Sequence, residues 1–253
     1  MSNVTGPIAG PGPLVDPADV PDWLRPLVAA TLDGPALTKA FAPFGRPQRG
    51  SAPRRGRSAA VLVLFGEDGL GPGSGLDVLL LRRADGLTSH PGQVAFPGGA
   101  LEPADDGPVD AALRESVEEV GVLPAGVRPV ATLPELHIPP SGFLVTPVLA
   151  HWREPCPVTA VDPAETAAVA RVPVAYLADP ANRFQVRHAS GAVGPAFAVP
   201  DMLVWGFTGG LLACLLRLAG WERPWDVSDV RELDVAWLAT RVRGRDNGVS
   251  WSP

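Results

Sequence analysis

Cysteine is scarce in this sequence, with two residues, Cys156 and Cys214, among 253. Their separation fits neither a CxxC pair nor a metal-binding motif, and two lone thiols are typical of a reducing compartment. We therefore expect a cytoplasmic protein, with a disulfide between the two cysteines as the minor alternative. Histidine is also scarce, and His137, His151 and His188 do not share the spacing that zinc ligands show. A zinc site is not expected.

Basic residues are outnumbered and scattered, because 21 Lys and Arg stand against 27 Asp and Glu, a formal net charge of −6. Long-range attraction to a nucleic-acid backbone needs a basic surface, so a nucleic-acid partner is not expected. A small anionic ligand needs only a local basic pocket, and such a pocket remains open. We expect a small-molecule partner, and the oligomeric state stays open, a homodimer included.

Long apolar runs are missing as well. The longest apolar segment is Met202 to Trp221, which is interrupted by glycines and by Arg217. A membrane-spanning helix needs about 20 apolar residues, so a buried helix is the better interpretation. Residues Met1 to Gly10 lack the basic start and apolar run of a secretory signal. We expect no association with a membrane.

Proline and glycine are abundant, with 30 and 28 residues, and their positions help to divide the chain. Residues 1–20 are rich in both and are expected to form a disordered or loosely attached N-terminal arm. One folded domain is expected over residues 21–240, with a short amphipathic helix near its start at 21–32. The polar residues 241–253 are expected to form a flexible C-terminal tail.

Apolar and β-branched runs predict a sheet within this domain. The runs at 58–65 and 77–83 are separated by a glycine-rich loop and are expected to pair. Further strands are predicted at residues 127–133, 143–150, 168–172, 184–187 and 196–199. Helices are predicted at 108–120 and 205–218. Strands and helices in this order indicate an α+β or a layered α/β/α domain.

The helix at 108–120 has clear end signals. Pro108 suits the first helical turn, and Gly121 suits the left-handed position that ends a helix. Leu113, Val117 and Val120 recur at i, i+4 and i+7, and we expect them to form the buried face.

Three carboxylates occupy another face of this helix, because Glu115, Glu118 and Glu119 lie at i, i+3 and i+4. Like charges so close repel each other by about 0.2–0.5 kcal/mol per pair on an exposed helix. A hard cation such as Mg²⁺, which prefers oxygen ligands, would relieve that repulsion. The alternative is a solvated acidic face compensated by Arg114, and the glutamates alone favour this alternative.

The residues before the helix reverse that balance. Gly98 and Gly99 precede it in a loop whose main chain can approach a metal or a phosphate closely. Residues 96–122 (FPGGALEPADDGPVDAALRESVEEVGV) resemble the Nudix box, Gly-x5-Glu-x7-Arg-Glu-U-x-Glu-Glu-x-Gly-U, in which U is a bulky apolar residue.

The end of the box matches better than its beginning. Residues 114–122 fit every defined position except Ser116, which replaces an apolar residue. Counted from Gly99, Asp105 stands at the first glutamate, and the spacing from there to Arg114 is one residue longer.

The longer spacing resembles the coenzyme A pyrophosphatase branch of the Nudix family. That branch has an upstream signature approximating Leu-Leu-Thr-x-Arg-Ser/Ala-x3-Arg-x3-Gly-x3-Phe-Pro-Gly-Gly, which residues 79–99 (LLLRRADGLTSHPGQVAFPGG) follow. Leu81 replaces the threonine, and Thr88 replaces the second arginine. Residues 205–208 (WGFT) also look like a landmark of the branch, so that the resemblance covers about residues 55–220.

The resemblance implies a Nudix-type α/β/α sandwich with a mixed β-sheet, and it implies roles in a site. Glu115 and Glu119 are expected to be the principal ligands of Mg²⁺ or Mn²⁺, with Glu118 a third ligand or an orienting neighbour. Glu119, Glu118 and Arg114 are the expected catalytic residues. Because arginine forms bidentate pairs with carboxylates, Arg114 is better read as bracing the glutamates than as touching substrate.

Substrate contacts are expected upstream of the helix. Arg82 and Arg83 end a strand and are candidates for phosphate binding, with ordinary strand-end charge as the equal alternative. His90 is a further candidate, although loop histidines are often only hydrogen-bonding groups. Gly98 and Gly99 complete the expected substrate site.

The resemblance implies metal-dependent hydrolysis of the diphosphate bond of coenzyme A or acyl-CoA. The products would be 4′-phosphopantetheine, or its acyl form, and adenosine 3′,5′-bisphosphate. The group that takes a proton from the attacking water is left open among Glu119, Glu118, Glu165 and Glu135. Two other functions stay open: hydrolysis of another nucleoside diphosphate derivative (ADP-ribose, NADH or a dinucleoside polyphosphate), which Thr88 favours, and a non-catalytic ligand-binding module.

Overall fold

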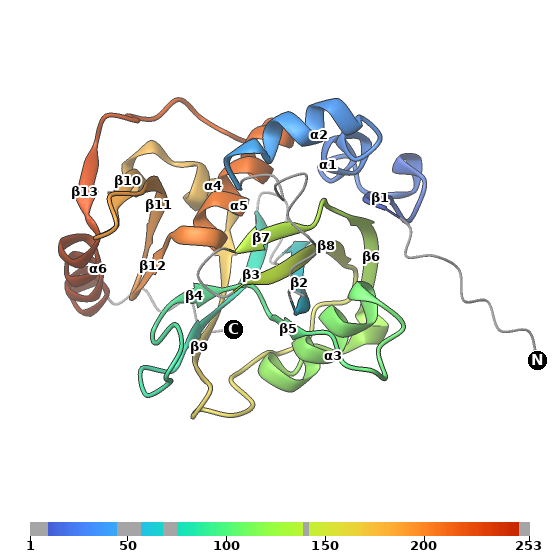
Figure 1. The fold of residues 1–253 in the computed structure, drawn as a ribbon, viewed down its shortest axis with the longest axis horizontal. Coiled ribbons are helices and arrows are strands. Elements are labelled where there is room, and N and C mark those ends of the chain that lie inside the picture. Colours follow the sequence, from blue (N-terminus) through green and yellow to red (C-terminus); the bar gives the residue numbers. More distant parts are fainter. Residues whose placement is uncertain (1–9, 45–56, 68–74, 139–141, 248–253) are drawn as a thin grey trace, which may run out of the picture.

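The computed structural model describes residues 10–44, 57–67, 75–138 and 142–247, which Figure 1 shows as a ribbon. The described strands form one sheet of nine and one of four. The first sheet comprises β1 (Gly12–Pro13), β2 (Ser58–Glu67), β3 (Leu76–Arg83), β4 (Val94–Ala95), β5 (Gly98–Ala100), β6 (Val127–Thr132), β7 (Leu136–Ile138), β8 (Phe143–Trp152) and β9 (Thr166–Pro173). The second comprises β10 (Arg183–Arg187), β11 (Val193–Val199), β12 (Met202–Val204) and β13 (Val230–Glu232). The α-helices are α1 (Arg25–Ala30), α2 (Gly34–Ala40), α3 (Pro108–Val120), α4 (Val174–Ala178), α5 (Gly206–Leu218) and α6 (Leu233–Asn247).

The first sheet is mixed. Its central strands β2 and β8 run parallel, whereas β3 pairs antiparallel with β2 and β9, and β6 pairs antiparallel with β8. The predicted pairing of the runs at 58–65 and 77–83 is confirmed by β2 and β3. The strands predicted at 127–133, 143–150 and 168–172 are also present, as β6, β8 and β9.

β2 and β3 pair over three residues, from Phe65↔Val78 to Glu67↔Leu76, and then separate. The segment 94–100 fills the gap between them. Its first part, β4, pairs with β3, and its last part, β5, pairs with β2. Between the two, the amide of Leu62 donates to the carbonyl of Pro97 at 2.8 Å. The segment is therefore held by a strand on each side.

Helices cover both faces of this sheet. Successive residues of a strand point to opposite faces, so neighbouring residues of β2 pack against different helices. Val63 and Phe65 of β2 pack in one apolar cluster with α1, α2 and α5. Leu62 and Leu64 pack in the other cluster with α3. In Figure 1, α1, α2 and α5 lie above the sheet and α3 lies below it. This layering confirms the predicted α/β/α domain.

The helix α3 has the predicted bounds, and Gly121 ends it with a left-handed φ of 72°. The predicted buried face was wrong at Val117, which is 39% exposed. Ser116 is buried instead, together with Ala111, Ala112 and Val120. The Ser116 hydroxyl donates to the Leu113 carbonyl at 2.7 Å, so its polar atom is satisfied within the helix and can face the core.

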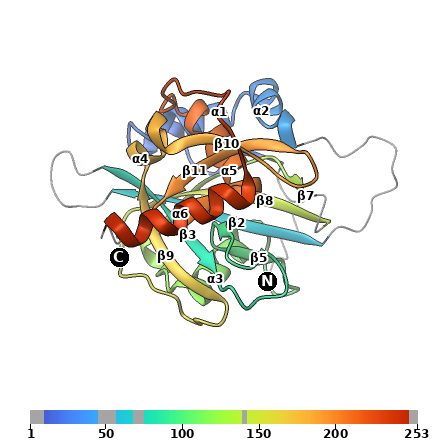
Figure 2. The same cartoon turned by 90° about the vertical axis from the view of Figure 1, so that its left-hand side faces the viewer.

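The second sheet has the order β12-β11-β10-β13, and its inner strands β10 and β11 contain the runs predicted at 184–187 and 196–199. One face packs on α5 through residues such as Phe197, and the other packs on α6 through Phe184 and Ala236. Figure 2 shows α6 running across this outer face. The predicted long apolar helix at 205–218 is α5.

Both ends of the chain differ from the sequence predictions. From residue 10 onward the expected loose arm belongs to the fold: β1 pairs with β6 (Gly12↔Thr132), and Val20 is buried. At the other end, α6 continues to Asn247, although residues from 241 were expected to form a flexible tail. The composition of residues 10–20 misled because pairing with β6 stabilises a segment that looks irregular alone. The polar composition from residue 241 does not prevent the chain from continuing α6. Within the described ranges, no helix is long and apolar enough to cross a membrane.

Candidate active site

Gly98 and Gly99 bring the main chain against both the sheet and α3. A Cβ atom on Gly98 would overlap the carbonyl oxygen of Ala60, and one on Gly99 would overlap the carboxylate of Glu115. Gly98 also has a φ of 156°, a conformation that L side chains rarely adopt. Gly98 therefore permits a close approach to β2 that a side chain would block, and Gly99 leaves room for the Glu115 carboxylate.

Glu119 is fixed by this turn, because the amide of Gly98 donates to its Oε2 at 2.9 Å. Burial raises the pKa of Glu119 to about 7; the Gly98 amide and Arg83 lower it, and the charges of Glu115 and Glu165 raise it. A carboxylate thus lies in a partly buried place beside further carboxylates, which favours its neutral form unless a cation is present.

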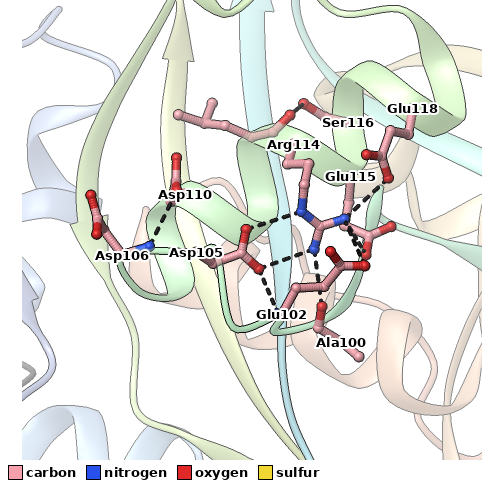
Figure 3. A network of polar contacts seen from close by, with 10 residues as sticks. Ala100, Glu102, Asp105, Asp106, Asp110, Arg114, Glu115, Ser116 and Glu118 are labelled. Carbon is pink, nitrogen blue, oxygen red and sulfur yellow. Dashed lines mark hydrogen bonds and ion pairs between the residues drawn. The ribbon is translucent and has the colours of Figure 1, made fainter.

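Arg114 connects the loop to the helix, as Figure 3 shows. Its Nε and Nη2 donate to the two carboxylate oxygens of Asp105 at 3.0 and 3.1 Å. Nη2 also donates to the Ala100 carbonyl at 3.1 Å. Nη1 lies 3.1 Å from an oxygen of Glu115 and 3.1 Å from one of Glu118. All three guanidinium nitrogens therefore have partners, which gives Arg114 the geometry of a brace.

Asp105 occupies its place although it departs from the box in residue type and spacing. Its side chain is 3% exposed and forms the bidentate pair with Arg114. The Arg114 guanidinium lowers the pKa of Asp105, which keeps the carboxylate charged. The longer loop thus still delivers a carboxylate to the arginine.

The three glutamates of α3 do not converge. Glu119 and Glu115 face the glycine turn, and burial raises the pKa of Glu115 also. Glu118 lies on the outside, with a side chain that is 57% exposed and directed to Arg114. Over the described residues, no three His, Cys, Asp or Glu side chains are arranged so that they could hold a metal ion. What the structure brings together is the pair Glu115 and Glu119.

Of Arg82, Arg83 and His90, it is Arg83 whose charge acts on Glu119. Its charge lowers the pKa of Glu119, and its Nε is buried without a hydrogen-bond partner among the described residues. Arg82 instead pairs with Asp85 at 3.1 Å. His90 is exposed, and its Nδ1 lies 3.1 Å from the Gln93 side chain.

Glu165 is also brought to the site. The register of β3 and β9 pairs Arg83 with Thr166, and the amide of Ala84 donates to the Glu165 carbonyl at 2.8 Å. The charge of Glu165 raises the pKa of Glu119. The two strands are predictable from the sequence, but the place of Glu165 beside Glu119 is not, because strand register cannot be read from two apolar runs.

The sequence model of the NUDIX domain matches residues 54–189, just over half of the chain. A protein of Cronobacter sakazakii described as "Uncharacterized Nudix hydrolase NudL" is 42% identical over 130 residues, which are 51% of this chain and 64% of that protein. The protein of the same description from Klebsiella aerogenes is 43% identical over 104 residues, 41% of this chain and 82% of that protein. The chain thus spans slightly less than two thirds of the first relative.

Solved structures show weaker likeness. A Nudix hydrolase from M. smegmatis, RenU, is 21% identical with a TM-score of 0.46, over 67% of this chain and 89% of that chain. The NUDIX domain of Shewanella oneidensis NrtR, solved with ADP ribose, is 19% identical with a TM-score of 0.37, over 54% and 83%.

A mixed sheet between helical layers, with a double-glycine turn facing two glutamates of a helix, has the form of a Nudix domain. The sequence match over residues 54–189 makes the assignment direct. The chain belongs to the Nudix family.

Proposed function

We propose that this protein is a divalent-metal-dependent hydrolase of the diphosphate linkage in nucleoside diphosphate derivatives, with coenzyme A or an acyl-CoA as its first candidate substrate. The observation that carries the proposal is the pair Glu115 and Glu119 at the glycine turn, where Arg114 donates to Glu115 and the Gly98 amide donates to Glu119. The relatives named Nudix hydrolase support the class of reaction. A cytoplasmic location and a small-molecule partner belong to the same proposal, resting on two free thiols and the net charge of −6.

The donor set at the turn fits a hard cation. Burial raises the pKa values of both Glu115 and Glu119, and their negative charges repel each other. A divalent cation would therefore stabilise both carboxylates. Oxygen ligands are those that Mg²⁺ and Mn²⁺ prefer, and Mg²⁺ commonly uses one or two carboxylates with waters and substrate phosphate. We assign Glu115 and Glu119 as the holding residues and Glu118 as an orienting neighbour.

Bound Mg²⁺ or Mn²⁺ would supply charge neutralisation on the diphosphate and a more acidic water. The chain's own residues do the rest. The Nη1 of Arg114 donates to both Glu115 and Glu118 and fixes their positions, and Gly98 holds Glu119 through its amide. Arg83 offers a buried Nε that has no hydrogen-bond partner within the described part of the chain, which suits a phosphate oxygen.

Glu165 is the proton acceptor that the arrangement favours. It lies close enough to act on the pKa of Glu119, and its main chain is tied to Ala84. Glu119 accepts a hydrogen bond from the Gly98 amide, Glu118 accepts one from Arg114, and Glu135 lies between β6 and β7. A positioned carboxylate that is not a metal ligand can take a proton from the attacking water.

A second substrate class is favoured by the loop between β3 and β4. Thr88 stands where the coenzyme A branch has an arginine, and Arg82 is paired with Asp85. Coenzyme A carries a 3′-phosphate in addition to the diphosphate, and a loop without that arginine offers less positive charge to bind it. ADP-ribose, NADH or a dinucleoside polyphosphate is therefore the alternative substrate.

The test is incubation with Mg²⁺ and a panel of coenzyme A, acetyl-CoA, ADP-ribose, NADH and diadenosine polyphosphates, with products resolved by mass. We expect 4′-phosphopantetheine from coenzyme A, and loss of that product in Glu119→Gln. Cleavage of ADP-ribose or NADH but not coenzyme A would keep the reaction and replace the substrate. A folded, metal-loaded protein that cleaves nothing in the panel would favour the non-catalytic binding module.

A further inference from the structure

The start of α5 reaches the candidate active site from the opposite face of the sheet. Thr208 is buried, and its Oγ1 donates to the carbonyl of Val94 at 2.9 Å. A helical threonine commonly bonds back to its own helix, as Thr240 does to Ala236 at 2.9 Å. Thr208 instead joins two segments that are 114 residues apart.

The first turns of α5 give this hydroxyl a fixed position. A Cβ on Gly209 would lie 2.7 Å from the carbonyl oxygen of Pro195, so the helix packs directly on β11. On the next residue, a Cβ would lie 2.9 Å from the ring of Phe44, which also contacts Phe207 edge to face. The second sheet and the N-terminal segment thus enclose this part of α5, and interiors packed so closely transmit displacement.

The acceptor lies at the start of the segment that forms the site. Val94 is followed by buried Phe96, and four residues after Val94 the amide of Gly98 holds Glu119. Val94 and Ala95 form a strand of only two residues against β3. A hydroxyl bond from α5 therefore adds a support to the short strand from which the glycine turn extends.

We propose that Thr208 is a positioning residue for the candidate active site, which acts by fixing Val94 and, through it, the turn that holds Glu119. The kinetic part of this inference rests on the proposed function. Removing the hydroxyl leaves the Val94 carbonyl without that donor and lets the segment 94–99 shift. Since small misplacements of reacting groups lower rates strongly, a defect in turnover is expected beyond any loss of stability.

Three variants test this: Thr208→Val, which removes the hydroxyl at nearly equal volume, Thr208→Ser, which keeps it, and Thr240→Val as the matched control. Thr240 is also buried and also donates at 2.9 Å to a carbonyl, but within its own helix. Each variant is measured for its melting temperature, for kcat and KM, for the Mg²⁺ concentration at half-maximal rate, and for amide hydrogen exchange over residues 94–99.

We expect both valine variants to melt about 2–6 °C lower, since each loses a buried hydrogen bond. Thr208→Val should in addition lower kcat about tenfold, raise the Mg²⁺ requirement several-fold and speed exchange over residues 94–99 at least threefold. Thr208→Ser should restore all three, and Thr240→Val should leave them unchanged. A folded Thr208→Val protein with wild-type kcat, Mg²⁺ requirement and exchange would overturn the inference.

The exchange measurement separates this inference from the proposed function. If the wild-type protein cleaves nothing in the substrate panel, the proposed function fails, while faster exchange in Thr208→Val alone still supports the positioning role. If the wild-type protein is active and exchange over residues 94–99 is equal in the two valine variants, the positioning role fails and the function stands.

Discussion

Arg114 beside the glycine turn and Arg183 in the second sheet are both withdrawn from solvent, with side chains 22% and 1% exposed, but their surroundings differ. Arg114 has acceptors for all three nitrogens, four of its five hydrogen bonds going to carboxylate oxygens. In Arg183, Nη2 donates a hydrogen bond to Glu222 at 2.9 Å. The other two nitrogens of Arg183 have no hydrogen-bond partner among the described residues.

Aromatic rings take the place of acceptors around Arg183. Its guanidinium lies 4.6 Å from the ring centroid of Trp225 and 5.2 Å from that of Phe197, and burial lowers the pKa of Arg183. Such contacts stabilise by cation–π attraction and by packing. Burial of an arginine therefore does not by itself mark a site. Arg114 orders several carboxylates around a turn, whereas Arg183 fills space between the second sheet and the segment after α5.

The largest expected effect comes from removing the ordered network. Arg114→Ala should lower kcat by about 100- to 1,000-fold, equivalent to about 3–4 kcal/mol, because Glu115 and Glu118 lose their common partner. Arg114→Lys should recover little, since a lysine cannot form the bidentate pair with Asp105. Steady-state kinetics at saturating Mg²⁺ measure this. Equal activity of the alanine variant and the wild-type protein would remove Arg114 from the site.

The second effect concerns stability and pH in the absence of metal. The folded-state pKa of Glu119 is raised to about 7 from 4.5, so the unfolded chain loses this proton first as pH rises. The group thus costs no stability below about pH 4.5, and its cost is complete above about pH 7. Glu119→Gln should gain stability over the wild-type protein between pH 5 and 8, by roughly 1–3 kcal/mol.

Melting temperatures in chelator at pH 5 and pH 8 measure that gain, and Glu118→Gln, which alters an exposed carboxylate of the same helix, is the control. If the difference in melting temperature between Glu119→Gln and the wild-type protein is the same at both pH values, burial and the neighbouring negative charges do not raise the pKa of Glu119.

A smaller effect is expected at the other arginine. Arg183→Met keeps the long apolar stem between the two rings, and Glu222, with a side chain 30% exposed, can reach water. Replacing a buried ion pair by an apolar residue is often neutral, so the stability should change by less than about 1.5 kcal/mol. Denaturant unfolding measures it, and kcat should stay within twofold. A loss of activity as large as in Arg114→Ala would contradict the comparison.

The smallest effect is expected at Ser116, where the box has an apolar residue. Its hydroxyl donates to the Leu113 carbonyl of its own helix. In an alanine variant that carbonyl keeps its main-chain hydrogen bond within the helix. Ser116→Ala should therefore change stability by less than about 1 kcal/mol, with alanine's higher helix propensity offsetting the lost bond. Calorimetric melting with kinetics at one substrate concentration is sufficient. A tenfold loss of turnover would show that Ser116 has a role outside its helix.

The sequence allowed the local part of the site to be predicted. The bounds of α3, the glycine turn and the pairing of β2 with β3 follow from short-range signals: a proline, a glycine at a helix end, and apolar runs. The face that α3 buries was predicted less well. Apolar spacing pointed to Val117, but packing against the sheet favours small residues, and a serine that bonds within its helix is small enough.

What could not be predicted depends on contacts between distant segments. Arg82 and Arg83 were equal candidates in sequence, and the fold separates them, one to Asp85 and one toward Glu119. The bond from Thr208 to Val94 has no sequence signal beyond the similarity of residues 205–208 to a family landmark. The second sheet beyond residue 189 lies outside the family match, and α6 was not foreseen.

The Mg²⁺ dependence of turnover in the wild-type protein, Glu119→Gln and Glu118→Gln tests the central claim most directly. If Glu115 and Glu119 hold the metal and Glu118 only orients, the wild-type protein is inactive in chelator. Glu119→Gln then shows no detectable turnover at any Mg²⁺ concentration, and Glu118→Gln stays within about tenfold of the wild-type protein. Wild-type turnover in chelator, or full turnover by Glu119→Gln, would contradict the account.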